Sequence, residues 1–237
     1  MNGFTAFGYD VDDSGGEKDV SKLFVSKVIS SHFGLCVSLP LYYKVLCDEL
    51  GGDSFLAVAP NHMYIKHIAE DGNWVNVELT TGSFARDEWY IQSMGVTTEA
   101  IKNGIFLSAM NDKENIAFLL YMLGVVYQRK FGDYDYFTLM CANRILEELP
   151  NSHLGYILTI ATRQQWGHDY LEIIGHKLSS FIVDNYEKYL YAKNSLSRLG
   201  FTSISIKDYI KQVEKGYQDA HIDAPNEWNR FRNSIIP

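Results

Sequence analysis

The sequence predicts an α+β fold, in which a helix carrying a cysteine packs on a small antiparallel sheet and an all-α region follows. Short segments rich in β-branched and aromatic residues, separated by turn residues, fill positions 54–79. An apolar pattern with helical spacing precedes them at 35–50, and helical patterns fill most of the chain from position 111 onward. These observations divide the chain into a core, residues 1–110, and a helical region, residues 111–237.

The first predicted helix begins near Cys36. Proline is tolerated only close to a helix start, so Pro40 places the first turn near residues 36–39. Cys36 would then lie where unpaired backbone N–H groups and the helix dipole favour a thiolate and could bind an oxyanion. Cys47, three turns further on, is expected to be an inert apolar side chain. The apolar stripe consists of Leu35, Leu39, Tyr42, Leu46 and Leu50, and Gly51-Gly52 ends the helix.

Three strands are predicted next, at 54–59, 62–68 and 73–79, with Asp71-Gly72-Asn73 as the last turn. A two-residue loop would place His62 and Glu78 on opposite faces of the sheet, whereas an odd loop of three or five residues places them together. The odd register gives one face with His62, Tyr64, Lys66, Trp74, Asn76 and Glu78, and an apolar face with Met63, Ile65, Val75, Val77 and Leu79. The apolar face is the one expected to be buried.

Helices account for the rest of the prediction. After a loop at 80–83, short helices are expected at 86–93 and 97–103. Asn111 and Glu114 have the spacing of a capping box before a helix that Gly132 ends, and Pro150 stops the next helix, which starts near 134. Further helices are expected at 152–165, 168–193, 205–217 and 226–235.

Three short motifs resemble the transglutaminase-like superfamily, which is related to papain-type cysteine hydrolases. They are Gly34-x-Cys36 at a helix start, Asn61-His62 at a strand start, and the strand Trp74-Val-Asn-Val-Glu78-Leu-Thr80. The resemblance covers about residues 20–110. It implies that Cys36 is the nucleophile, His62 the general base and Glu78 the residue that orients His62.

This chain departs from the family pattern at two places. The family more often has Asp where Glu78 stands, and no Gln lies a few residues before Cys36 to complete an oxyanion hole. The resemblance therefore implies that the Cys36 amide and one further donor bind the oxyanion or the substrate. The candidates for that donor are Asn76, Trp74 and Tyr64.

The helical region resembles the tetratricopeptide-like helices that follow such a core in some bacterial proteins. The similarity rests on Leu123-Gly124 with Tyr127 in one helix and on Ile145 to Pro150 at the end of the next. So few repeats cannot form a free solenoid, so these helices are expected to pack against the core. Alternatively they line a groove for a peptide or protein partner, with Tyr121, Tyr127, Tyr134 and Tyr136 along it.

Composition narrows the classes of function. The chain has 237 residues, 46% of them hydrophobic, and a net charge of −8, as expected for a soluble globular protein with no nucleic-acid partner. No CxxC, HExxH or clustered carboxylate pattern occurs, so neither a metal nor a cofactor is expected. His62 and His67 would lie on opposite faces of one strand and could not share an ion. The longest apolar stretch, 116–127, is too short to span a membrane.

Two classes of function stay open at this point. One is a cysteine hydrolase or acyltransferase that acts on an amide or peptide bond, and an open cleft at Cys36 would favour it. The other is a catalytically silent scaffold whose helices bind a partner, which a sulfur covered by Trp74 or Tyr64 would favour.

Residues 1–16 are polar and are expected to be disordered at their start. The compartment is cytoplasmic if Met1 is the native start and extracytoplasmic if a leader has been removed; substrate and oligomeric state stay open.

Overall fold

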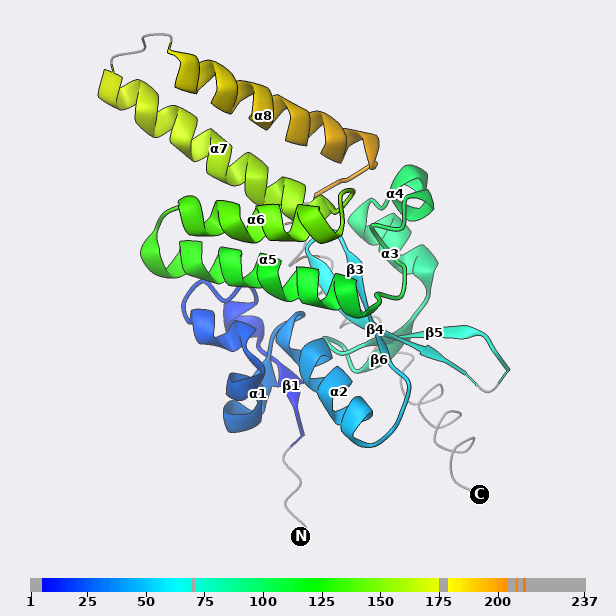
Figure 1. Cartoon of the computed structure of the whole chain (residues 1–237). Helices are drawn as coiled ribbons and strands as arrows, with labels where there is room; N and C mark the ends of the chain where they lie inside the picture. Colours follow the sequence, from blue (N-terminus) through cyan, green and yellow to red (C-terminus); the bar gives the residue numbers. More distant parts are fainter. Residues whose placement is uncertain (1–5, 70, 175–178, 204–207, 209–210, 212–237) are drawn as a thin grey trace, which may run out of the picture. The chain divides into compact units, whose positions relative to one another are not determined.

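A computed structural model describes residues 6–69, 71–174, 179–203, 208 and 211, and shows a mixed α+β protein (Figure 1). The described chain divides into two compact units. The first is formed by the described residues within 1–96, 106–109 and 202–211, and the second by the described residues within 97–105 and 110–201. Residues 97–105, which precede the predicted boundary, thus belong to the helical unit. Apart from residues 208 and 211, the helices predicted at 205–217 and 226–235 lie outside the described residues.

The first unit begins with small elements that the sequence analysis did not predict. Strand β1 (Gly8–Tyr9) pairs in parallel with β2 (Phe33–Gly34), and the short helix α1 (Val25–Ser31) precedes β2. Two 3-10 turns lie between β1 and α1, at Val11–Asp13 and Val20–Leu23. The buried Asp13 carboxylate accepts hydrogen bonds from the backbone N–H groups of residues 17, 18 and 19, which folds this segment.

Helix α2 spans Ser38–Glu49 and starts two residues after Cys36. Pro40 lies in its first turn, as predicted. The chain already turns at Leu35, because the Leu39 N–H donates to the Leu35 carbonyl at 3.0 Å. The Ser38 hydroxyl fixes this turn by accepting from the Leu35 N–H and donating to the Lys22 carbonyl. A Cβ at Gly34 would lie 2.8 Å from Val28, so only glycine fits between α1 and the start of α2.

A four-stranded antiparallel sheet follows in the order β3-β4-β5-β6. The strands are β3 (Phe55–Ala59), β4 (His62–Ile68), β5 (Trp74–Glu78) and β6 (Ser83–Ala85). The first three agree with prediction, whereas β6 falls partly in the expected loop. Ile68 pairs with Trp74, so the loop between β4 and β5 has five residues, 69–73. The odd loop is confirmed, and it places His62 and Glu78 on one face.

The expected burial of that sheet was wrong for β5. Its polar residues Asn76 and Glu78 are buried, whereas Val75 and Val77 on the apolar face are only half-buried. Helix α3 (Asp87–Met94) explains the difference, because its fully buried Tyr90 stacks on Tyr64 and so covers the polar face. In β4, residues 62–66 are buried without interruption, so both faces of this strand are covered.

The helical unit contains α4 (Thr98–Lys102), α5 (Asp112–Phe131), α6 (Tyr136–Glu148), α7 (His153–Ile174) and α8 (Ser180–Arg198). The capping box of Asn111 and Glu114 is confirmed at the start of α5. The predicted break between 165 and 168 was wrong, since α7 continues to 174. Gly167 lies inside this helix, where a glycine costs only about 1 kcal/mol and therefore need not end it.

Apolar packing among α5, α6 and α7 builds the core of the helical unit. Its buried centre consists of Ala117, Cys141, Ala142, Ile145 and Leu158. Helix α4 is tied to the end of α8, because the Thr97 hydroxyl donates to the Gly200 carbonyl at 2.7 Å. Within the described residues, no helix combines the length and the apolar character that crossing a membrane requires.

Candidate functional site

Three predicted residues meet at one place in the first unit. Cys36 lies in the turn before α2, His62 begins β4 and Glu78 ends β5. The His62 Nε2 atom lies 2.6 Å from Glu78 Oε2. Cys36 lies near enough to His62 to contribute to raising the pKa of the imidazole, and its Sγ is 3.9 Å from the carbonyl oxygen of the neighbouring Asn61. The structure thus arranges the side chains in the order Cys36, His62, Glu78.

The turn before β4 aims the imidazole. Ala59 pairs directly with His62, so Pro60 and Asn61 form a two-residue hairpin loop. Asn61 has a φ of 58°, which asparagine adopts more readily than most residues with a side chain. The tight turn fixes the first residue of β4, so the His62 side chain points from a rigid position.

Cys36 lies just outside α2 and not inside its first turn. Val37 is the N-cap residue. Among the described residues, the backbone N–H groups of Cys36 and Val37 donate no hydrogen bond within the protein. Free N–H groups beside a nucleophile can bind the oxyanion that forms when the nucleophile attacks a carbonyl group. The Cys36 amide was expected to be one such donor, and the Val37 N–H could be the second, which was sought among the side chains of Asn76, Trp74 and Tyr64.

Glu78 is held by groups that the sequence analysis did not assign to the site. Its Oε1 accepts hydrogen bonds from the Thr80 N–H at 3.0 Å and the Thr80 hydroxyl at 2.6 Å. Its Oε2 accepts from the Tyr90 hydroxyl at 3.1 Å as well as from His62. Burial raises the pKa of Glu78, but His62 and Thr80 outweigh it and hold the pKa below its usual value. The carboxylate is therefore ionised at neutral pH.

A local signal in the sequence points to only one of the two extra partners of Glu78. Thr80 ends the third motif, two positions after Glu78, and a Thr after a strand-end carboxylate can hydrogen-bond back to it. Tyr90 gives no such signal, because it lies in a helix twelve residues away. Only the packing of α3 on the sheet brings it to Glu78.

The pKa of His62 is strongly perturbed. Burial lowers it, whereas the negative charge of Glu78 and the hydrogen bonds with Cys36 and Glu78 raise it to about 10. Glu78 engages Nε2, so Nδ1 is the nitrogen left for Cys36. An imidazole that holds a proton between a thiol and a carboxylate can stabilise a thiolate and later give the proton to a leaving group.

The three candidates for a further donor, Tyr64, Asn76 and Trp74, lie at different distances from Cys36, His62 and Glu78. Tyr64 is fully buried, stacks on Tyr90 with ring centroids 4.2 Å apart, and has its ring centroid 6.5 Å from that of His62. Asn76 donates instead to Asp87 Oδ1, at 2.7 Å. Trp74 begins β5, about 13 Å along the strand from Glu78 at 3.3 Å per residue. The structure therefore separates Trp74 from the triad.

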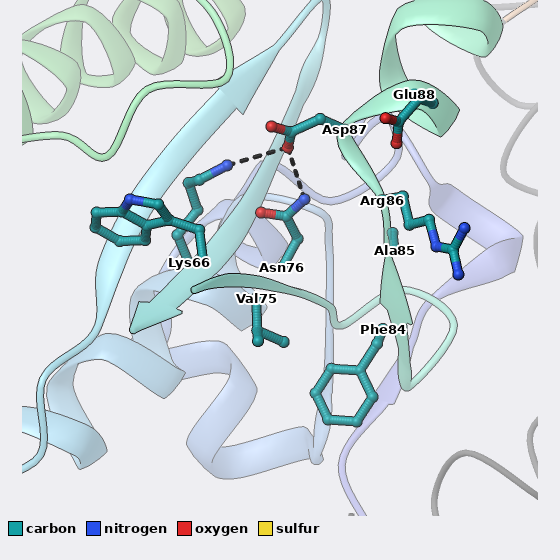
Figure 2. A pocket seen from close by; sticks show the side chains of 9 residues that line it. Lys66, Val75, Asn76, Phe84, Ala85, Arg86, Asp87 and Glu88 are labelled. Carbon is teal, nitrogen blue, oxygen red and sulfur yellow. Dashed lines mark hydrogen bonds and ion pairs between the residues drawn. The ribbon is translucent and has the colours of Figure 1, made fainter. Parts of the chain in front are cut away.

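Trp74 and Asn76 line a pocket of about 380 Å³ at the other end of the polar face (Figure 2). The ammonium group of the buried Lys66 lies 3.1 Å from Asp87 Oδ1, the same oxygen that accepts from Asn76. Val75 from β5, Phe84 and Ala85 from β6, and Arg86, Asp87 and Glu88 at the start of α3 complete the lining. The sequence analysis placed Lys66 and Asn76 on one face, but did not predict this pocket.

The four tyrosines that were predicted to line a groove differ in their surroundings within the helical unit. Tyr121 and Tyr134 pack against the core of that unit, and burial raises the pKa of Tyr121 to about 12. The Tyr127 hydroxyl donates to Asp135 Oδ2 at 2.7 Å, which joins α5 to the N-cap of α6. Tyr136 is largely exposed. Tyr121 and Tyr134 therefore contribute to packing, and Tyr136 is the one of the four most accessible to a partner.

All three cysteines are free thiols, and Cys36 and Cys141 are both buried. In the part of the chain that the structure describes, no group of three or more His, Cys, Asp or Glu side chains could hold a metal ion. Comparison with protein-family models, curated proteins and solved structures finds no match. Only the geometry of the site therefore bears on the function of this chain.

Proposed function

We propose that this chain is a cysteine hydrolase or acyltransferase with a transglutaminase-like core, acting on an amide or peptide bond through a thioester at Cys36. The observation that carries the proposal is the position of His62, whose Nε2 lies 2.6 Å from Glu78 Oε2 and whose imidazole is near enough to Cys36 for that residue to raise its pKa. If His62 and Glu78 formed only a structural ion pair, that pair would not require a thiol beside it. A thiol, an imidazole and a carboxylate in this order are the parts that thiol catalysis requires.

The proposed reaction has two steps. The Cys36 thiolate, paired with the His62 imidazolium, attacks the substrate carbonyl, and the N–H groups of Cys36 and Val37 bind the resulting oxyanion. His62 then protonates the leaving amine as the carbon–nitrogen bond breaks, which leaves a thioester. Water or a second amine, deprotonated by His62, attacks the thioester and releases Cys36. Water gives hydrolysis, and an amine gives acyl transfer.

The pH dependence of alkylation at Cys36 tests this proposal. Iodoacetamide reacts with thiolates, and mass spectrometry reports each cysteine separately. We expect Cys36 to react faster than Cys47 and Cys141 and to stay reactive below pH 7, because the His62 imidazolium stabilises its thiolate. Cys141 is a matched control, since its exposed fraction of 5% is close to the 7% of Cys36.

Two histidine variants separate the dyad from a general effect on folding. His62→Ala should abolish the reactivity of Cys36 below pH 7. His67→Ala removes a histidine from the opposite face of the same strand and should leave that reactivity unchanged. If Cys36 reacts no faster than Cys141 at any pH, or if both variants behave alike, the thiolate–imidazole pair does not exist and the enzymatic proposal fails.

A second candidate function is a scaffold with tetratricopeptide-like helices that binds a peptide or protein partner. One observation favours it: Ile116, Leu119 and Leu123 on α5 have exposed fractions of 60%, 50% and 46%. Their spacing of three and four residues puts them on one helix face. If Cys36 proves unreactive, the scaffold function is the one that we propose. Replacing Ile116, Leu119 and Leu123 by Ser should then abolish partner binding without unfolding α5.

A further inference from the structure

The pocket beside Trp74 has polar groups on its floor that are held before any ligand arrives. The Lys66 ammonium and the Asn76 amide both donate to Asp87 Oδ1, at 3.1 and 2.7 Å. Both bonds end on one oxygen of Asp87, and within the described part of the chain no group donates to its other oxygen, which can accept from a ligand. Lys66 and Asn76 are 4% and 5% exposed, whereas the Asp87 side chain is half-exposed. The floor is therefore rigid, and Asp87 reaches from it into the opening.

Asn76 also provides an acceptor that no described residue satisfies. Its Oδ1 is buried and has no hydrogen-bond partner among the residues that the structure describes. The amide orientation is fixed, since Nδ2 must face the Asp87 carboxylate. Figure 2 shows this oxygen turned towards the side of the pocket where Lys66 lies. A buried acceptor without a partner is costly, so this geometry suits a ligand that brings a hydrogen-bond donor.

The charges around the pocket balance. Lys66 and Arg86 are cationic, and Asp87 and Glu88 are anionic. Lys66 is already paired with Asp87. A ligand with a net charge would therefore meet no uncompensated opposite charge on the floor, and a neutral ligand fits better.

One wall of the pocket is aromatic. Trp74 is 48% exposed although it is a large apolar side chain, and Phe55 supports it in an edge-on contact with centroids 5.4 Å apart. A supported aromatic face that stays open to solvent offers a flat surface for the C–H groups of a ring. The volume of about 380 Å³ lies near the lower end of the range for small-molecule pockets, about 300–1,000 Å³.

We propose that this pocket binds a neutral sugar, a monosaccharide or one terminal ring of a longer saccharide. Hydroxyl groups both donate and accept, so one ring can donate to Asp87 and Asn76 Oδ1 and accept from Lys66. The C–H face of the same ring packs on Trp74. The proposal is independent of thiol chemistry, because none of these groups touches Cys36 or His62 in the described structure.

Titration of the ¹⁵N-labelled full chain tests the site. The probes are glucose, galactose, mannose and N-acetylglucosamine, up to 50 mM. At least one of them should shift the Trp74 indole and Asn76 amide signals, with a dissociation constant of about 1 mM for a ligand of this size. Lysine and glutamate serve as charged probes and should shift neither signal.

Two variants and two controls locate the binding. Trp74→Ala changes an exposed side chain and should weaken sugar binding at least tenfold, as should Asp87→Asn. Trp166→Ala removes a tryptophan of the helical unit and should have no effect, and Cys36→Ser should bind as the wild type does even if the proposed catalysis fails. The proposal is overturned if none of the four sugars shifts the two signals, if the charged probes shift them instead, or if Trp74→Ala binds as tightly as the wild type.

Discussion

At the scale of single residues, Glu78 decides the protonation of the candidate site. Its carboxylate accepts hydrogen bonds from Thr80, Tyr90 and His62, and it is almost completely buried. A buried carboxylate that stays ionised needs such partners, because desolvation alone would neutralise it. The residue types and their order along the sequence were enough to single out Cys36, His62 and Glu78. The support from Tyr90 was not predictable, since no local pattern links it to Glu78.

Glu78→Gln should weaken the perturbation of His62. Burial lowers the pKa of His62, whereas the Glu78 charge and the hydrogen bonds and charges of Glu78 and Cys36 raise it to about 10, so removing the Glu78 charge should lower the pKa markedly. In the wild type the imidazole should stay protonated from pH 6 to 8, and in the variant it should lose its proton at a lower pH. Imidazole ¹⁵N shifts measure the protonation of His62 in both proteins. An unchanged titration in the variant would show that Glu78 does not control His62.

At the scale of elements, the length of a loop and the close packing of helices decide the structure more than the local propensity of single residues does. The turn residues 71–73 indicated a hairpin, but only the pairing of Ile68 with Trp74 showed that the loop has five residues. Similarly, a break between helices was predicted at 165–168, whereas α7 runs through this segment and through Gly167. Helix α7 gains from packing along its length against α6 and α8, which a single glycine of modest cost does not offset.

Two glycines in α7 should respond in opposite ways to alanine. In Gly155→Ala the new Cβ would lie 2.6 Å from Leu146 Cγ, so we expect a loss of about 1–3 kcal/mol in the free energy of unfolding from overpacking. In Gly167→Ala the nearest atom is Asn185 Nδ2 at 3.4 Å, so the better helix propensity of alanine should stabilise the protein by up to about 1 kcal/mol. Urea unfolding measures the free energy of unfolding of both variants and shows which is the less stable. Equal free energies of unfolding would mean that α6 and α7 are not so closely packed.

At the scale of the whole molecule, the two units should lose stability at opposite ends of the pH range. The pKa of His62 is raised, so its proton stabilises the first unit fully below pH 6.5, and this contribution is lost as pH rises towards 10. Burial lowers the pKa of His153 in the helical unit to about 4, so the contribution of its neutral form is present above pH 6.5 and is lost as pH falls towards 4. Each of the two histidines changes the free energy of unfolding by at most about 1.4 kcal/mol per pH unit.

Hydrogen exchange measured from pH 4 to 10 can follow both units in one molecule, after correction for the intrinsic pH dependence of exchange. We expect protection to fall first in the helical unit on acidification and in the first unit at alkaline pH. His153→Gln should flatten the acid response of the helical unit and leave the alkaline response of the first unit intact. A single transition shared by both units at each end of the range would refute separate control by the two histidines.

The sequence by itself determined the mixed α+β class, three strands, the capped start of α5, and the order of Cys36, His62 and Glu78. These features follow from residue types and short spacings, which act through neighbours along the chain. The tertiary structure decided that the polar face of the sheet is covered by Tyr90, that β6 extends the sheet, and that Lys66, Asn76 and Asp87 converge at a pocket. These features depend on side chains that are distant in sequence, and their burial is fixed only when the helices pack.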